Sequence, residues 1–490
     1  MCYNNRTMNM SIAFLASEVA PFAKTGGLAD VAGALPGALA GAGASVRVLM
    51  PFYREVKKKK PPVRKLWEDR IVDGLGRSLP YAVHELKEAG VATLFIEHDP
   101  YYDRDFLYGT PAGDYPDNGE RFSFFARAAL ETLKKTGQAA DILHAHDWQS
   151  APALAYLRFL HSGDPFFKRT RTVFTIHNLA YQGQFEKDIL GRIGLPESLF
   201  NLNDLEFYGK VNFLKAGILY ADAVTTVSPR YSREIQTPEF GCGLDGLLRQ
   251  RSRVLHGILN GVDYASWDPA RGVLIPARYG PADLAGKSVC KEELIRMFGL
   301  PASAAERPVV GVVSRLAGQK GFDLVADALD EMLKRDFVLI VLGTGEEKIQ
   351  ETLKAAQKAH PDRFGLKIAF DEKVARTIYA GSDFFLIPSR YEPCGLTQMY
   401  SLKYGTIPVV RATGGLDDTI REFDPSSRAG NGFKFDDYTE AALLACLDRA
   451  LAQWRNKAVW ADLVRNAMAE DFSWGRSAQA YLDLYREILS

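Results

Sequence analysis

Apolar runs of five to seven residues recur along the chain, and longer segments with a helical period separate them. Most runs are apolar almost throughout, which is typical of parallel strands that are buried on both faces. The predicted strands are Ser11–Ser17, Ser45–Pro51, Val91–Glu97, Asp141–Asp147, Thr172–Asn178, Ala223–Ser228, Pro308–Ser314, Phe337–Gly343, Leu366–Phe370, Phe384–Pro388 and Ile407–Arg411. Helical patterns such as Glu120–Thr136, Phe322–Arg335 and Glu346–His360 lie between them. This alternation predicts right-handed βαβ units and open sheets.

The alternating pattern is set up twice, which predicts an α/β protein with two Rossmann-like, doubly wound domains. A chain of 490 residues suits two domains of roughly 200–250 residues each. We place the domains at 1–258 and 259–472, with an amphipathic helix in 473–490 that is expected to cross back to the first domain. The connection Val254–Pro276 has no clear period and is the expected hinge.

Composition narrows the class of protein. The chain is 47% hydrophobic and 24% charged, with 60 basic and 60 acidic residues, so nucleic-acid or anionic-membrane binding is not expected. Five cysteines without a CxxC pair predict neither disulfides nor a zinc site, and favour the cytoplasm. The apolar stretch Ile12–Ala20 is interrupted by Glu18, which argues against a signal peptide, and Met1–Met10 is predicted to be a disordered leader. No run reaches the ~20 apolar residues of a membrane span.

Polar and glycine-rich segments follow the predicted strands. In open α/β sheets, ligands bind beyond the carboxyl ends of the strands. The segments at these ends are Lys24–Asp30, His144–Trp148, Thr175–Asn178, Val227–Pro229, Ser314–Gly321, Gly343–Gly345, Ser389–Leu396 and Thr413–Leu416. The sequence therefore predicts a ligand site at this edge of each sheet.

Three of these segments are predicted to bind anions. Lys24 stands beside two glycines whose backbone N–H groups are expected to face phosphate at a helix N-terminus. Arg315 and Lys320 bracket a second glycine-containing loop, and Thr413–Gly415 repeats the glycines without a cation. Together the three loops favour a phosphate-bearing ligand.

Other phosphate and metal motifs fit less well. Gly286–Ser288 resembles the end of a P-loop, but the preceding glycine is one residue too far away and no strand precedes it. Gly343–Glu346 lacks the third glycine of a dinucleotide fingerprint. Asp103–Asp105 is an Asp-x-Asp candidate in a Tyr-rich loop, and His144 and His146 share a strand face, but no third ligand is evident. We keep metal binding as an alternative and expect no metal.

Five segments together resemble the signatures of bacterial glycogen synthases and plant starch synthases. They are Lys24–Leu28, His146–Trp148, Thr175–Asn178, Asn260–Asp263 and Pro388–Gln398. The match runs in order from Lys24 to Leu416. The resemblance implies the GT-B architecture, with the donor in an interdomain cleft. It also implies transfer of glucose from ADP-glucose to the non-reducing end of an α-1,4-glucan, with retention at the anomeric carbon.

The resemblance assigns roles to matching residues. The implied catalytic residues are Glu392, His177, Asp147, Lys320 and Arg315. The implied donor-binding residues are Lys24, Gly26, Gly27, Arg315, Lys320, Phe370, Cys394, Gly395, Leu396 and Thr397. The implied acceptor- or sugar-binding residues are Asp30, Asp147, His177 and Asn260. ADP-glucose is a substrate, so neither a metal nor another cofactor is expected.

Within this set, Arg315 and Lys320 are implied to hold the donor diphosphate, and Lys24 to approach it from the other domain. Glu392 is implied to contact the donor glucose or to stabilise positive charge at the anomeric carbon. Adenine is implied to pack on Phe370, where the family often has Tyr. His177 contacts the sugar and Asp147 places the acceptor hydroxyl, by the same resemblance.

The residue eight positions after Glu392 bears on the chemical route, and two rival functions are considered beside it. Related retaining transferases often carry a second Glu eight positions after the first, and that position is Tyr400 here. Double displacement by two carboxylates is therefore poorly supported, and we favour same-face attack in which the departing phosphate oxygen takes the acceptor proton. A UDP-glucose-using or small-acceptor transferase is one alternative, and a non-catalytic glucan- or nucleotide-sugar-binding protein is the other.

Overall fold

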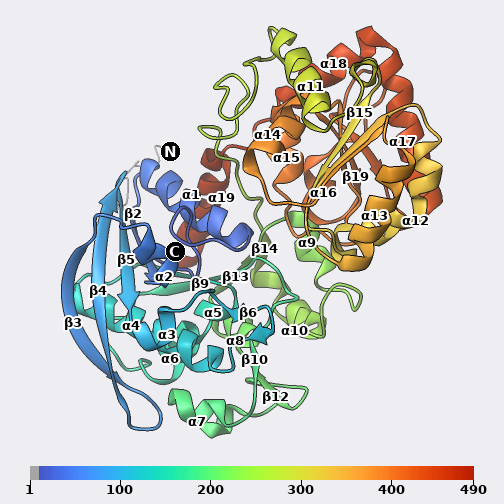
Figure 1. The fold of residues 1–490 in the computed structure, drawn as a ribbon. Coiled ribbons are helices and arrows are strands. Elements are labelled where there is room, and N and C mark those ends of the chain that lie inside the picture. The colour runs from blue at the N-terminus through green and yellow to red at the C-terminus, as the bar shows by residue number, and fades with distance from the viewer. Residues whose placement is uncertain (1–9) are drawn as a thin grey trace. The chain divides into compact units, whose positions relative to one another are not determined.

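The computed structural model describes residues 10–490, which form two compact units (Figure 1). Unit 1 contains the described residues up to Val227, then 232–261 and 474–490, and unit 2 contains 228–231 and 262–473. The chain thus leaves unit 1 after Gly261 and returns to it at Trp474. The predicted leader Met1–Met10 lies outside the described residues except for Met10, which is buried.

Unit 1 is built on a nine-stranded sheet within residues 10–490, in the order β14-β13-β9-β8-β1-β2-β5-β4-β3. Its strands are β1 (Ser11–Leu15), β2 (Ser45–Pro51), β3 (Arg64–Val72), β4 (Ser78–Glu88), β5 (Val91–Glu97), β8 (Ile142–His146), β9 (Arg171–Ile176), β13 (Ala223–Thr226) and β14 (Leu255–Gly257). All neighbours are parallel except β3–β4 and β4–β5. The continuous apolar run of β1 is explained by its burial from Ile12 to Leu15.

The hairpin β3–β4 was missed by the sequence analysis. The edge strand β3 is mostly exposed or partly buried, and its neighbour β4 is buried only at Tyr81–Val83. A search restricted to continuous apolar runs of five to seven residues does not detect such strands. The blue strands in Figure 1 show the hairpin extending the sheet beyond β5.

The other elements of the N-terminal half are mostly helices. The helices are α1 (Gly27–Gly41), α2 (Arg54–Lys58), α3 (Asp99–Tyr102), α4 (Asn118–Lys135), α5 (Asp147–Ser150), α6 (Pro152–Phe159), α7 (Ile189–Ile193), α8 (Phe213–Tyr220), α9 (Pro229–Glu234) and α10 (Asp245–Gln250). Short strands are β6 (Gly109–Thr110), β7 (Gly113–Asp114), β10 (Gln184–Phe185), β11 (Glu206–Phe207) and β12 (Lys210–Asn212). The C-terminal helix α19 (Trp474–Leu489) also belongs to unit 1 and packs on α1.

Unit 2 holds a six-stranded sheet in the described chain, ordered β17-β16-β15-β18-β19-β20, and all its pairs are parallel. The strands are β15 (Val309–Val313), β16 (Val338–Leu342), β17 (Phe364–Lys367), β18 (Phe384–Ile387), β19 (Ile407–Arg411) and β20 (Phe433–Phe435). The helices are α11 (Ala285–Met297), α12 (Phe322–Leu333), α13 (Glu347–Ala359), α14 (Glu372–Gly381), α15 (Thr397–Lys403), α16 (Gly414–Thr419), α17 (Glu440–Arg455) and α18 (Lys457–Met468). The α/β class with parallel sheets is confirmed, although β17 begins two residues before the predicted Leu366–Phe370.

No helix among residues 10–490 is long and apolar enough to cross a membrane. The basic segment Lys57–Lys60 has the composition of a solvated loop, but its first two residues belong to α2. Lys57 forms ion pairs with Glu97 and Asp99. The ammonium of Lys59 donates hydrogen bonds to backbone carbonyls just before Lys24.

Candidate active site

Each sheet places predicted site residues just beyond the carboxyl ends of its parallel strands. In unit 1, the segment with Lys24 follows β1, Asp147 follows β8 and His177 follows β9. These three strands are adjacent in the order β9-β8-β1, so their carboxyl ends meet at one edge. The arrangement is that of a ligand site at the edge of an open sheet.

The Lys24 loop, which we define as Lys24–Gly27, presents a cation at the start of α1. The Lys24 ammonium lies 2.6 Å from an Asp30 carboxylate oxygen, and half of the Lys24 side chain is exposed. A Cβ at Gly26 or Gly27 would meet no atom within 4 Å, so open space lies in front of both glycines. The loop can therefore be approached closely by a ligand.

Glu18 is a site residue that the sequence analysis did not select. It is buried, and its carboxylate accepts hydrogen bonds from the backbone N–H of Thr25, the Thr25 hydroxyl and, at 3.1 Å, the N–H of Gly26. The Gly26 amide therefore already has an anionic partner, which differs from the prediction that it faces phosphate. Glu18 was visible in the sequence as the single charged residue in Ile12–Ala20.

Asp147 and His177 are brought together by adjacent strands. The N–H of His177 donates to Asp147 Oδ1 at 2.7 Å, so Asp147 does not merely cap the helix that it begins. Burial raises the pKa of Asp147 to about 7; backbone hydrogen bonds oppose the rise, and the charge of Glu18 adds to it. Asp147 also has φ of +54°, a strained value that often marks functional positions.

The His177 imidazole is neutral near pH 7, because burial lowers its pKa to about 3. Its Nε2 lies 3.0 Å from Nδ1 of His146, and burial also lowers the pKa of His146. Both ring nitrogens of His144 form hydrogen bonds. Nε2 lies 2.6 Å from the Thr175 hydroxyl, and Nδ1 lies 2.7 Å from the Tyr485 hydroxyl of α19. These bonds hold the imidazoles in one buried row.

The metal alternatives receive no support from the ligand geometry. No group of three or more His, Cys, Asp or Glu side chains among residues 10–490 is arranged to hold a metal ion. Asp103 and Asp105 both bind the guanidinium of Arg54, each at 2.7 Å. Lys287, in the segment that resembles the end of a P-loop, also binds other protein groups. Its ammonium donates to the Ala380 and Tyr404 carbonyls and to the Thr406 hydroxyl.

In unit 2, a partly buried ion pair joins the two predicted catalytic loops. Lys320 Nζ lies 2.6 Å from Glu392 Oε2, and the Ser389 hydroxyl donates to the same oxygen at 3.0 Å. Gly321 allows this approach: its φ is +78°, and a Cβ there would lie 2.0 Å from the Pro388 carbonyl oxygen. Glu392 is only 7% exposed.

The remaining cations of this region differ in their surroundings. Arg315 is exposed, and one guanidinium nitrogen lies 3.1 Å from the Gln319 side-chain oxygen. Arg390, two residues before Glu392, forms an ion pair with Asp323 at 2.7 Å. Arg315 and Lys320 are therefore the cations of the β15 loop that can meet an anion.

The glycines of Thr413–Gly415 serve packing. A Cβ at Gly414 would lie 1.9 Å from the Glu392 carbonyl oxygen, and a Cβ at Gly415 equally close to that of Cys394. The Gly415 N–H donates to the Glu392 carbonyl at 3.1 Å. This loop thus supports the backbone around Glu392, and its role as an anion site stays a prediction.

The other predicted binding residues lie as follows. Gly395, with φ of +67°, and Leu396 precede α15, which begins at Thr397. Phe370 is 96% exposed, so its ring is open to a planar ligand. Asn260 in unit 1 is buried, and its Oδ1 has no hydrogen-bond partner in the described part of the chain.

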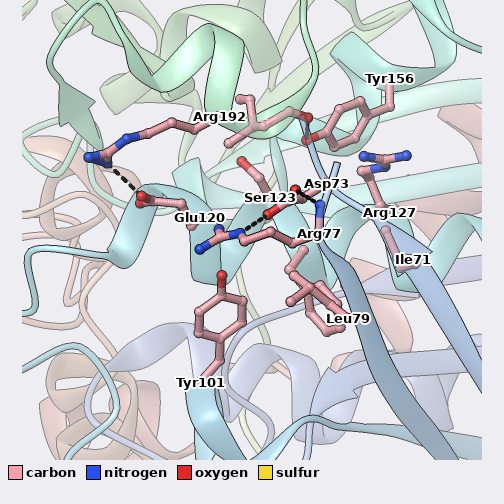
Figure 2. Close-up of a pocket in the computed structure, with 12 residues that line it drawn as sticks. Ile71, Asp73, Arg77, Leu79, Tyr101, Glu120, Ser123, Arg127, Tyr156 and Arg192 are labelled. Atoms are coloured by element: carbon pink, nitrogen blue, oxygen red, sulfur yellow. Dashed lines mark hydrogen bonds and ion pairs between the residues drawn. The ribbon is translucent and has the colours of Figure 1, made fainter. Parts of the chain in front are cut away.

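One pocket of unit 1 lies apart from these residues. It is lined by the β3–β4 hairpin and by residues of α4, α6 and α7, and Figure 2 shows its charged side chains. Two of its arginines are paired, Arg77 with Asp73 and Arg192 with Glu120, both at 2.6 Å. It contains none of the predicted site residues.

Comparisons with known proteins match the whole chain. The starch synthase catalytic domain matches residues 11–250, and the glycosyl transferases group 1 family matches residues 300–467. A glycogen synthase of Koribacter versatilis is 49% identical over 488 residues, covering 98% of each chain. A glycogen synthase of Anaeromyxobacter sp. (strain Fw109-5) is 50% identical, covering 98% of this chain and 99% of that one.

Two solved structures extend the comparison. The catalytic domain of starch synthase IV from Arabidopsis thaliana, bound to ADP and acarbose, has a TM-score of 0.90 at 34% identity, covering 98% of this chain and 99% of that one. Sucrose-phosphate synthase from Thermosynechococcus elongatus has a TM-score of 0.59 at 17% identity, with the same coverage, and supports the fold alone.

Proposed function

Because the chain belongs to the family of glycogen and starch synthases, we propose that it transfers glucose from ADP-glucose to the non-reducing end of an α-1,4-glucan. The chain is a glucosyltransferase with the GT-B fold. The ADP in the starch synthase IV structure supports the choice of donor, and the glycogen synthase names of the relatives support the acceptor.

One observation carries the proposed chemistry: the ion pair of Lys320 with the buried Glu392, in a loop that also holds the exposed Arg315. As the bond from the anomeric carbon to the diphosphate breaks, negative charge develops on the leaving oxygen, and Arg315 and Lys320 stabilise it. Glu392 stabilises the positive charge that develops on the sugar. Lys24 is proposed to bind the same diphosphate.

Retention follows from same-face attack in this proposal. The acceptor hydroxyl attacks the anomeric carbon from the side that the diphosphate leaves, and the departing phosphate oxygen takes its proton. Tyr400 occupies the place of a second carboxylate, and its ring stacks on Trp267 with centroids 3.8 Å apart. A covalent glycosyl-enzyme intermediate at this position is thus not proposed. Asp147 and the neutral His177 orient the acceptor hydroxyl and the sugar.

No metal or other cofactor takes part in this proposal, because side-chain cations fill the electrostatic role. A cytoplasmic location is also proposed. It is supported by Cys242, Cys290 and Cys446, which form no disulfide among the described residues, since cysteines outside disulfides are usual in a reducing compartment.

The test is a transfer assay with purified protein and radiolabelled donor. ADP-glucose and UDP-glucose are each supplied with glycogen or with free glucose as acceptor, and Lys320→Ala provides the background rate. The proposal expects label from ADP-glucose in glycogen. A preference for UDP-glucose or for free glucose would instead support the alternative transferase, and no transfer from either donor would support a non-catalytic binder.

A further inference from the structure

Glu18 forms several hydrogen bonds with the Lys24 loop, although the proposed chemistry gives this residue no role. Besides the two backbone N–H groups and the Thr25 hydroxyl, its carboxylate accepts a hydrogen bond from the Tyr108 hydroxyl at 2.7 Å. Hydrogen bonds to a charged acceptor are stronger than neutral ones. The carboxylate therefore acts as an internal anion that fixes the loop from the protein side.

Lys59 fixes the preceding turn from the other side. Its ammonium donates to the carbonyls of Pro21 at 2.7 Å and Phe22 at 2.8 Å. The turn is closed further by the N–H of Phe22, which donates to the Val19 carbonyl at 2.8 Å. With Glu18 inside and Lys59 outside, the backbone leading to Lys24 has little freedom to move.

Glu18 also interacts with a second part of the site. Its negative charge helps to raise the pKa of the Tyr53 and Tyr108 hydroxyls and of the Asp147 carboxyl. The negative charge of Glu18 adds to the effect of burial in raising the pKa of Asp147. One carboxylate thus interacts with both the Lys24 loop and Asp147.

We propose that Glu18 is a positioning residue, whose carboxylate holds the Lys24 loop in the conformation that binds the donor diphosphate next to Asp147. It acts through Lys24 and does not touch the reacting atoms. This inference rests on the proposed function for the identity of the ligand. A buried carboxylate that served folding alone would affect stability without affecting the ligand.

The first experiment is a double-mutant cycle on ADP affinity, measured by calorimetry for wild type, Glu18→Gln, Lys24→Met and the double variant. Glu18→Gln removes the negative charge and replaces one acceptor oxygen with an NH₂ group, which disrupts the hydrogen bonds to Thr25 and Gly26. We therefore expect the dissociation constant for ADP to rise about tenfold. Because Glu18 acts through Lys24, the double variant should bind ADP as weakly as Lys24→Met and no more weakly.

The second experiment separates positioning from folding by a pH profile. The rate of glucose transfer should rise as Asp147 ionises, because the carboxylate accepts a hydrogen bond from the acceptor hydroxyl. Glu18→Gln removes a nearby negative charge, so the pKa of Asp147 falls and the midpoint of the profile should move to lower pH. Glu120→Gln is the matched control, since this carboxylate of unit 1 lies in the pocket of Figure 2.

The outcomes are distinguishable. Any one of three results would overturn the role of Glu18. They are a dissociation constant of Glu18→Gln within about twofold of wild type, additive effects in the double-mutant cycle, and an unmoved midpoint of the pH profile. If Glu18→Gln does not fold, Thr25→Val removes one bond to the same carboxylate and should weaken ADP binding severalfold; unchanged binding would also overturn it. If wild type binds ADP but transfers no glucose, the proposed function fails, whereas the binding cycle still tests Glu18.

Discussion

At the residue scale, the charge of Glu392 is balanced by the ammonium of Lys320, and the Ser389 hydroxyl donates to the same oxygen. The carboxylate is nearly buried, so its field acts in surroundings that screen it weakly. In the proposed mechanism, this carboxylate stabilises positive charge on the sugar more strongly than it stabilises neutral glucose. Its proposed contribution therefore belongs to the transition state.

Glu392→Gln should lower kcat by roughly 10²–10³-fold and change the donor KM little, because the amide keeps the shape of the side chain without its charge. Steady-state rates over a range of ADP-glucose concentrations measure both constants. Glu422→Gln is a matched control, since Glu422 is an exposed carboxylate of unit 2 that pairs with Arg449. A large rise in KM at unchanged kcat would contradict the role of Glu392.

At the element scale, α19 supports the strands that carry the unit 1 site. The hydroxyl of Tyr485 lies 2.7 Å from His144 Nδ1, and the ring of His144 lies 4.0 Å from that of His146. His146 in turn contacts His177. The last helix of the chain is thus connected by direct contacts to a predicted site residue from a segment about 300 residues earlier.

Tyr485→Phe should reduce the free energy of unfolding by about 1–2 kcal/mol, because His144 Nδ1 then stays buried without its partner. Urea denaturation followed by fluorescence measures the change. Gln479→Ala alters an exposed residue of the same helix and should leave the midpoint close to that of wild type. Equal stability of Tyr485→Phe and wild type would show that the hydrogen bond contributes nothing.

At the scale of the whole molecule, the cations near the predicted phosphate sites are side chains, and two of them, Lys24 and Lys320, pair with carboxylates. Lys24 lies in unit 1, and Arg315 and Lys320 lie in unit 2. Carboxylate clusters are the usual means of holding a divalent metal beside a diphosphate, and the Asp103 and Asp105 carboxylates bind Arg54 instead. Electrostatic stabilisation of the leaving group is thus assigned to side chains.

Glucose transfer should therefore continue in excess EDTA at a rate within about twofold of the untreated enzyme. The measurement compares initial rates without chelator, with EDTA and with EDTA followed by Mg²⁺. EDTA saturated beforehand with Ca²⁺ controls for effects other than chelation. Abolished turnover that Mg²⁺ restores would disprove metal-independent catalysis.

Much of the architecture was readable in the sequence, because local patterns report burial. The strands β2, β5 and β19 have the predicted bounds, since a strand buried on both faces is apolar throughout. The positions of Asp147 and His177 next to each other followed from parallel strands whose carboxyl ends meet at one edge. The hairpin β3–β4 was not predicted because neither strand is buried along its whole length, so neither has a continuous apolar run.

Contacts between distant residues were decided by the tertiary structure. The Glu18 carboxylate beneath the Lys24 loop, the glycines of Thr413–Gly415 against Glu392 and the bond from Tyr485 to His144 all depend on the packed backbone. A glycine required for close packing and a glycine that faces phosphate look the same in sequence. Likewise, a lone Glu in an apolar run does not reveal which N–H groups it will meet. Local periodicity encodes which face is buried, whereas the partner of a polar group is set only when the chain has folded.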